Sequence, residues 1–162
     1  MSEPMISSEQ ITIVVVGKPV AKGRARSTMT GRHYTPETTR VAESAVVATW
    51  YQNIGIDREP HDGPFTIEIV SAFEPPVSWA KWKREAALAG SIRHTTKPDA
   101  DNLLKLVTDA LNEHAYVDDS RAFHVSALKK YSETASTTIT MTFHPTTEYH
   151  LNTDRKDNAW TQ

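Results

Sequence analysis

Two aspartates, Asp99 and Asp101, lie two residues apart directly after Pro98. Proline disfavours helix in the residue before it and is common at the first helical position, so this segment predicts the junction between an extended segment and a helix. A single aspartate there is explained by helix capping. A pair is harder to explain, because neighbouring carboxylates repel each other unless a cation or a proton lies between them. Oxygen ligands without cysteine or paired histidine suit Mg²⁺ or Mn²⁺, so Asp99 and Asp101 are candidate metal ligands.

Lys105 lies one helical turn beyond Asp101. From this position its ammonium group could contact a phosphate oxygen held by the same metals. Asp109 follows four residues later on the same polar face of the predicted helix. A solvated face with a weak Lys105–Asp109 ion pair explains this spacing equally well. Lys105 is therefore a candidate catalytic residue, with the solvated ion pair as the alternative.

A second pair of acids, Asp118 and Asp119, comes between this helix and the next predicted strand. Two adjacent aspartates usually belong to a turn. A short return from the helix to the strand could instead bring them beside the first pair and supply a third carboxylate. Three carboxylates around one or two hard cations suit phosphodiester hydrolysis, because the cations polarise the phosphate, lower the pKa of the attacking water and stabilise the leaving oxygen.

The segment from residue 18 to residue 34 is basic and has no apolar periodicity, which predicts a long loop. Loops of this length in compact domains are usually functional or mobile. Each lysine or arginine that contacts DNA would neutralise one phosphate and make binding depend on salt. A solvated loop is the alternative, but five bases without any acid favour a polyanion. These candidate DNA-binding residues are Lys18, Lys22, Arg24, Arg26 and Arg32.

The 162-residue chain has a net charge of −2, which conceals two opposite blocks. Residues 18–40 carry a net charge of +5, and residues 99–119 carry −5. This division disfavours a uniformly basic DNA-coating protein and favours a polyanion-binding segment combined with a carboxylate cluster. The chain has no cysteine, no apolar run long enough to span a bilayer and no signal-peptide pattern, and its seven histidines show no ligand spacing. We expect a cytoplasmic protein with no membrane partner.

Periodicity and turn residues predict a single domain with a mixed β-sheet packed with helices, an α/β or α+β fold. The expected strands cover residues 11–16, 65–73, 92–96, 122–131 and 136–143. The last two are expected to form a hairpin. Residues 1–10 are expected to be a flexible leader, residues 11–143 the folded domain and residues 144–162 a polar, disordered tail.

Three helices are expected between these strands. The first has Thr35 as its N-cap and ends near residue 52, the second covers residues 79–89, and the third follows Pro98 and ends near residue 112. The buried side of the first helix is expected to carry Val41, Ala45, Ala48 and Trp50 or Tyr51.

The acidic motifs together resemble the RusA family of Holliday junction resolvases, which are crossover junction endodeoxyribonucleases. The resemblance rests on KPDADNLLK at residues 97–105, DALN at 109–112 and YVDD at 116–119. In the basic segment, GKPVAKGR at residues 17–24 and YTP at 34–36 resemble the bacteriophage and prophage branch of this family. The resemblance spans about residues 11–143 and implies a RusA-like fold.

This resemblance implies that Asp99, Asp101 and Asp119 bind Mg²⁺ and that Lys105 is also needed for cleavage. It further implies a homodimer that binds four-way DNA junctions and nicks symmetrically placed strands, in DNA recombination and repair. Two alternatives stay open: a DNA-binding or assembly protein whose carboxylates only cap helices, and a Mg²⁺-dependent phosphohydrolase of small nucleotides. The basic loop disfavours the second alternative, since small substrates do not need a long cationic track.

Overall fold

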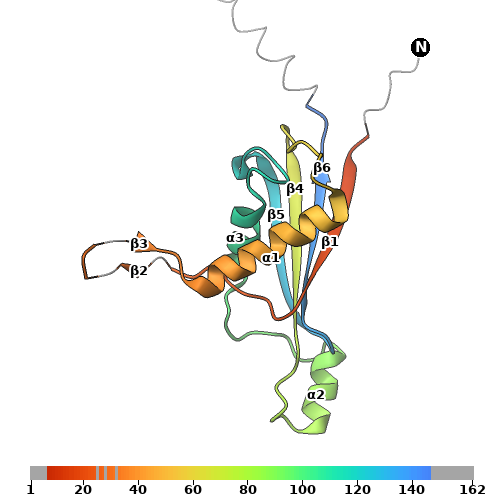
Figure 1. The fold of residues 1–162 in the computed structure, drawn as a ribbon. Helices are drawn as coiled ribbons and strands as arrows, with labels where there is room; N and C mark the ends of the chain where they lie inside the picture. Colours follow the sequence, from red (N-terminus) through yellow and green to blue (C-terminus); the bar gives the residue numbers. More distant parts are fainter. Residues whose placement is uncertain (1–6, 25, 28, 32, 147–162) are drawn as a thin grey trace, which may run out of the picture.

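The computed structural model describes residues 7–24, 26–27, 29–31 and 33–146. Its elements form a central sheet with helices against it, and a short strand pair extends from the body (Figure 1). In chain order they are β1 (Glu9–Val16), β2 (Arg26–Ser27), β3 (His33–Tyr34), α1 (Glu37–Ile54), β4 (Phe65–Phe73), α2 (Lys81–Leu88), α3 (Ala100–Leu111), the 3₁₀ turn Asp119–Arg121, β5 (Ala122–Tyr131) and β6 (Ser136–Phe143).

The four long strands form one mixed sheet in the order β1-β6-β4-β5. Strand β6 pairs antiparallel with both β1 and β4, whereas β4 and β5 are parallel. Parallel neighbours need a long crossover connection, and the segment between β4 and β5 supplies it with α2 and α3. The expected mixed sheet packed with helices is therefore confirmed.

The expected hairpin between the last two strands is wrong, because β4 lies between β5 and β6. The link between β5 and β6 crosses the end of β4, where the N–H of Ser132 donates to the carbonyl of Phe73 at 2.9 Å. Strand β6 instead pairs with β4 in a register that runs from Phe65–Phe143 to Ala72–Ser136. Alternation along a strand predicts its buried face, but it does not predict which strand lies beside it.

Helices α1 and α3 pack on each other and against the same sheet, α1 on β1 and α3 on β5 (Figure 1). Their apolar sides and the inner side of the sheet form the core. The largest fully buried apolar side chains are Trp50, Tyr116, Phe65, Ile13, Ile67, Ile69, Leu111, Ile139 and Met141. The core therefore supports α3 along its length, and α3 carries the aspartate pair at its start.

The buried side of α1 differs from the expected one. Trp50 is buried as expected, and Val46, one turn earlier, is buried with it. Val41, however, is 63% exposed, and Ala45 and Ala48 are also exposed. Small apolar residues lie on several sides of this helix, so periodicity leaves its orientation open and packing against the sheet selects one side.

Four expectations about individual segments also differ from the structure. Within the described residues no strand forms at 92–96, where the chain is irregular. The basic loop, expected to lack regular structure, contains the two-residue strand pair β2 and β3. Helix α1 begins after Pro36 without a side-chain cap in the described chain, so Thr35 is not its N-cap. Helix α2 begins at Lys81, two residues later than expected.

Strand β1 begins at Glu9, so the last residues of the expected leader belong to the sheet. Residues 1–6 and 147–162, which include most of the expected tail, lie outside the described residues. Among the helices that the structure describes, none is both long enough and apolar enough to cross a membrane.

Candidate active site

The aspartate pair lies at the N-terminus of α3. Asp99 is the N-cap residue, with extended backbone angles of φ −73° and ψ 143°, and its side chain makes no capping hydrogen bond within the described chain. Asp101 lies in the first turn, and both residues are exposed. The capping explanation therefore does not account for the side chain of Asp99, and both carboxylates face solvent at one end of the helix.

Lys129 on β5 fixes the backbone that leads into this pair. Its ammonium group donates hydrogen bonds to the carbonyl oxygen of Thr96 at 2.7 Å and to that of Pro98 at 2.9 Å. Hydrogen bonds from a charged donor are stronger than neutral ones. Because Thr96 and Pro98 lie on either side of Lys97, and Pro98 directly precedes Asp99, Lys129 holds the position from which the aspartate pair projects.

His94 anchors the same segment to the sheet. Its ring is buried and stacks on Phe73, with 4.2 Å between centroids, and lies 5.0 Å from the ring of Tyr131. Burial, together with the nearby charge of Lys129, lowers the pKa of His94, so the imidazole is neutral at neutral pH. His94 is thus a packing residue.

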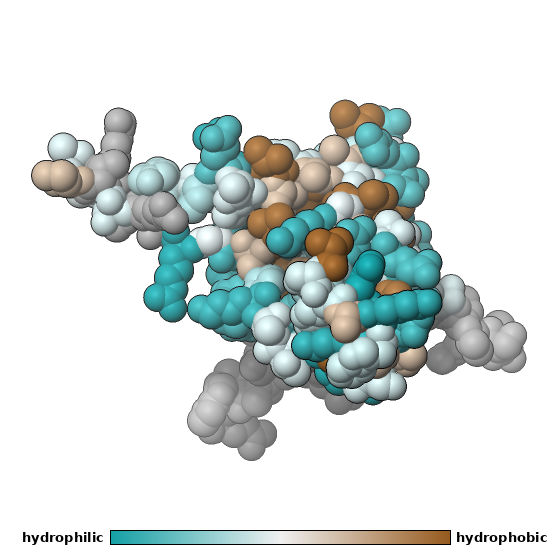
Figure 2. Space-filling model, turned by 90° about the horizontal axis from the view of Figure 1, so that it is seen from below, coloured by the Kyte–Doolittle hydropathy of each residue, from teal (hydrophilic) through white to brown (hydrophobic). Residues whose placement is uncertain are grey.

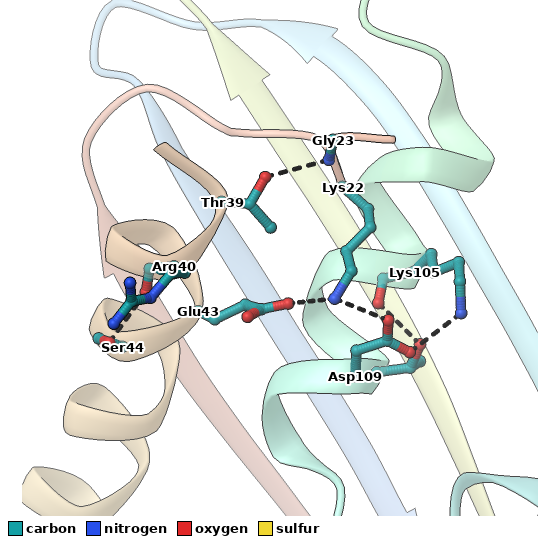
Figure 3. Close-up of polar contacts among 9 residues, drawn as sticks. Lys22, Gly23, Thr39, Arg40, Glu43, Ser44, Lys105 and Asp109 are labelled. Atoms are coloured by element: carbon teal, nitrogen blue, oxygen red, sulfur yellow. Dashed lines mark hydrogen bonds and ion pairs between the residues drawn. The ribbon is translucent and has the colours of Figure 1, made fainter. Parts of the chain in front are cut away.

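Lys22 from the basic loop is bound in a polar network between α1 and α3 (Figure 3). Its ammonium group pairs with Glu43 of α1 and with Oδ2 of Asp109 at 3.0 Å. Oδ1 of the same Asp109 accepts a hydrogen bond from Lys105 at 3.1 Å. The side chains of Lys22, Glu43 and Asp109 are each 24% exposed, whereas Lys105 is 61% exposed. The charge of Lys22 is therefore balanced within the fold, and Lys105 remains open to a ligand.

This network changes the acid–base properties of its members. Burial by itself raises the pKa of Asp109, but hydrogen bonds and charge from Lys22 and Lys105 outweigh it, so the pKa is lowered. Burial lowers the pKa of Lys22, but Glu43 and Asp109 outweigh burial and raise it. Asp109 thus stays ionised and Lys22 protonated at neutral pH, which keeps a charged acceptor beside Lys105.

The basic loop is also pinned through its backbone. The N–H of Lys22 donates to the carbonyl of Asn102 in the first turn of α3 at 2.9 Å. The N–H of Gly23 donates to Oγ1 of Thr39 at 3.1 Å (Figure 3). A Cβ atom at Gly23 would lie 2.8 Å from the same oxygen, so glycine permits this close approach. These contacts hold the start of the loop beside the start of α3.

The five candidate DNA-binding residues do not share one environment in the structure. Lys18 and Arg24 are exposed, and Lys22 is engaged by Glu43 and Asp109. Arg26 lies in β2, which with β3 projects from the body (Figure 1). Arg32 lies outside the described residues. Lys18 and Arg24 are therefore the two of the five whose described side chains face solvent.

Asp119 lies at the opposite end of α3 from the aspartate pair. Its N–H donates to Oδ1 of Asn112, the residue that follows α3, at 2.9 Å. At 1.5 Å per residue, about 16 Å of helix separates Asn112 from Asp101. Asp118 accepts a hydrogen bond from the N–H of Ser120, which lowers the pKa of Asp118 and caps the 3₁₀ turn.

The structure therefore brings Asp99, Asp101 and Lys105 to one half of α3 and leaves Asp119 apart from them. In the part of the chain that is described, no group of three or more histidine or acidic side chains could together hold a metal ion. Two features of the site were not expected from the sequence: the contact of Lys129 with the backbone before Asp99, and the role of Asp109 as a shared partner of two lysines. The position of Asp109 on the polar face of the predicted helix, four residues after Lys105, already indicated that it contacts Lys105. No sequence pattern indicated that Lys129, near the end of its strand, would reach the backbone before Asp99.

An apolar groove of about 460 Å³ lies between the end of β1, the start of α1 and α3. Its lining includes Val15, Val16, Val41, Leu103 and Leu106, and neither aspartate of the pair belongs to it. Lys18 and Glu37 are the charged members of this mainly apolar lining, so the groove contains one carboxylate and no pair that could hold a cation. We therefore place the candidate active site at the exposed start of α3 and not in this groove.

The chain is similar to a known protein family over most of its length. The chain matches the family model described as endodeoxyribonuclease RusA over residues 16–142, a range that contains Asp99, Asp101, Lys105 and Asp119. It is also 36% identical over 129 residues to the uncharacterized protein YqaN of Bacillus subtilis (strain 168), in an alignment that covers 76% of this chain and 89% of that protein. The chain belongs to the RusA family of endodeoxyribonucleases.

Proposed function

We propose that this protein is a Mg²⁺-dependent, structure-selective DNA endonuclease that resolves four-way junctions and other branched DNA by paired nicking, in recombination and repair. The observation that carries this proposal is the exposed pair Asp99 and Asp101 at the start of α3, with Lys105 one turn further on. The family match adds that the chemistry is cleavage of DNA. The substrate preference for branched DNA follows from the resemblance described above.

The donor set at the start of α3 fits a hard divalent cation. Mg²⁺ is usually bound by one or two carboxylates, with water and substrate phosphate completing the shell, and Asp99 and Asp101 are two such carboxylates. Mn²⁺ accepts the same ligands. The bound cation would polarise the scissile phosphate and lower the pKa of a water. Asp119 is the third expected ligand of the family, but its position beyond the far end of α3 means that the proposal rests on Asp99 and Asp101.

Lys105 has the position and charge to bind a non-bridging oxygen of the scissile phosphate. Its ammonium group is exposed, and Asp109 holds it from the C-terminal side. Lys22 shares Asp109, so this carboxylate stays neutralised when Lys105 turns toward DNA. Lys105 would then stabilise the negative charge that develops as water attacks in line and the 3′-oxygen leaves. The products would carry a 5′-phosphate and a 3′-hydroxyl.

Two further parts of the proposal concern DNA binding and assembly. Lys18 and Arg24, together with Arg26 and Arg32, would contact phosphates, while Lys22 positions the loop from within the network. Paired nicking needs two carboxylate sites on one junction, and a C₂ homodimer provides them with matching symmetry. Each protomer would then nick one of two symmetrically placed strands.

A plasmid that extrudes a cruciform tests this function directly. The first nick releases the supercoiling that maintains the cruciform, so linear product forms only if both nicks occur in one binding event. We expect linear plasmid with Mg²⁺ and no product with EDTA. A matched linear duplex should remain intact. Cleavage of the duplex at the same rate as the junction would refute structure selectivity, and nicked circles without linear product would refute paired nicking.

A second prediction concerns the clamp formed by Lys129. We expect Lys129→Met to weaken binding of Mn²⁺ by about 10- to 100-fold, the range typical of groups that orient metal ligands. The reason is that the carbonyls of Thr96 and Pro98 lose the donor that fixes the backbone before Asp99. Calorimetric titration of the free protein with Mn²⁺ measures this effect without cleavage.

Lys130→Met is the matched control for this change, because successive side chains on a strand point to opposite faces and Lys130 is exposed. It should leave the affinity for Mn²⁺ unchanged. Lys129→Arg keeps a charged donor and should restore part of the affinity. If Lys129→Met folds and binds Mn²⁺ as tightly as the unchanged protein, Lys129 does not position the aspartate pair.

A further inference from the structure

The segment 77–93, here named the α2 arm, extends beyond the end of the sheet and carries α2 (Figure 1). It is attached firmly to the body. The ring of Trp79 contacts that of Tyr131, with 5.5 Å between centroids, and Ala87 is 1% exposed within the core. Lys83 covers the Trp79 ring at 4.0 Å, a cation–π contact. The arm is therefore a fixed projection with a defined surface.

That surface combines an exposed aromatic ring with positive charge. Trp82 is 68% exposed, although a tryptophan side chain is usually largely buried. Lys81, Arg84 and Arg93 of the same arm are exposed as well. Residues 77–93 contain four lysines and arginines and one acid, Glu85, so the net charge of the arm is +3. Hydrophilic side chains cover much of the molecule seen from this end, with apolar ones interspersed (Figure 2).

The α2 arm lies at the same end of the molecule as the aspartate pair. Both of its connections lead there: it begins just after β4, and its other end continues through His94 to Asp99. His94 and Trp79 both pack against Tyr131 at the end of β5. Lys129, two residues earlier on β5, holds the segment before Asp99. DNA bound at the aspartate pair would therefore pass close to the arm.

We propose that the α2 arm is a second DNA-contact surface, in which Trp82 stacks on a base exposed at the branch point and Lys81, Arg84 and Arg93 contact phosphates. This inference rests on the proposed function, because it concerns how the same nuclease selects its substrate. An aromatic ring among cationic side chains is the combination that binds unpaired nucleotides, since every base has a face for stacking. A linear duplex offers no such face, so stacking by Trp82 favours branched DNA over duplex DNA.

The charge of the arm favours nucleic acid over a protein partner. An exposed tryptophan alone fits either partner, since aromatic residues are common in protein interfaces. The exposed side chains of Lys81, Arg84 and Arg93 on the arm are all cationic, and a nucleic-acid backbone offers a negative phosphate at every nucleotide to balance them. The only acid on α2, Glu85, lies 3.8 Å from Lys81, an exposed pair that water screens strongly.

Equilibrium binding in EDTA tests the inference without cleavage. The probes are a synthetic four-way junction and a linear duplex of the same sequence, with 2-aminopurine at the branch point of the junction. We expect Trp82→Ala to bind the junction about 5- to 100-fold more weakly, the range that corresponds to removal of one base–aromatic stack. The affinity for linear duplex should change little. Wild-type protein should change the 2-aminopurine fluorescence, and Trp82→Ala should not.

Two more variants complete the design. Trp82→Phe keeps a stacking ring and should retain most of the junction affinity. Val77→Ala alters another exposed side chain of the same arm, which is 88% exposed, and should have no effect. The double variant Lys81→Ala, Arg84→Ala should lower the salt slope by about 0.9 for each duplex phosphate that the protein no longer neutralises. Melting temperatures identify any variant that does not fold.

The outcomes separate this inference from the proposed function. If the unchanged protein prefers and cleaves the junction, and Trp82→Ala folds and does the same with equal affinity, the inference about the arm is wrong and the proposed function stands. If the unchanged protein shows no preference for the junction, both are wrong. Equal losses of affinity for junction and duplex in Trp82→Ala would also refute selective stacking on an exposed base.

Discussion

Asp101→Asn is expected to remove cleavage of a four-way junction while the protein still binds the junction. Changes in groups that only orient metal ligands already cost about 10- to 100-fold, so loss of a ligand itself should lower the cleavage rate by more than about 100-fold. Binding should persist, because asparagine removes a negative charge that repels DNA phosphate. The measurement is single-turnover cleavage of a labelled junction in Mg²⁺, together with equilibrium binding in EDTA.

Asp57→Asn provides the control, since Asp57 is an exposed aspartate in the connection after α1 and far along the chain from α3. It should cleave at the rate of the unchanged protein. Wild-type cleavage by Asp101→Asn would show that Asp101 does not bind the metal. A loss of folding in Asp101→Asn, seen as a lowered melting temperature, would instead support a capping role for its carboxylate.

Lys105→Met is the second change with a large expected effect. We expect the single-turnover rate to fall by about 100- to 1,000-fold, the usual cost of removing one donor that stabilises charge in the transition state. Affinity for the junction should fall far less, because Lys105 is one of many cationic groups that face the DNA. The fold should survive, since Asp109 keeps Lys22 as a partner at 3.0 Å and is not left as an unpaired charge.

Lys105→Arg tests whether a positive charge at this position is sufficient for the full cleavage rate. Arginine keeps the positive charge but presents a planar fork in place of a compact ammonium group, so only part of the rate should return. Lys130→Met, at an exposed lysine on β5, should leave the rate unchanged. If Lys105→Met lowers affinity and not the rate, Lys105 is a DNA-binding residue and has no part in the chemical step.

Local sequence patterns predicted where the strands begin and end better than they predicted which strands lie side by side. Strand β4 alternates apolar and polar residues, and its observed bounds, Phe65–Phe73, agree with the expectation. The bounds expected for β5 and β6 are also correct, yet their pairing is not, because β4 lies between them. Alternation depends on the residues of one strand, whereas pairing depends on the whole sheet.

The two long helices show the same limit of sequence patterns, because periodicity predicted their buried sides only in part. Proline before the aspartate pair correctly predicted the start of α3, and its buried side was largely correct. Periodicity predicts Leu103, Leu104, Val107, Ala110 and Leu111 on that side, and all but the half-buried Leu104 are buried. Leu106 is also buried, at 3% exposure, although it is not part of this predicted stripe. In α1 the expected Val41 and Ala45 are exposed, since the helix has small apolar residues on several sides. Contact with the sheet, and not periodicity, decided which side was buried.

The grouping of the aspartate pair with Lys105 in the first half of α3 could be predicted from the amino-acid sequence alone. Asp99, Asp101 and Lys105 lie within seven residues, so the geometry of one helix end brings them together. Their surroundings, by contrast, depend on the tertiary structure. Lys22 meets Glu43 across 21 residues, and Lys129 reaches the carbonyl of Pro98 across 31 residues. The position of Asp119 likewise depends on where the chain turns after α3. Such contacts form because packing against a common core brings distant segments together, and no local spacing encodes them.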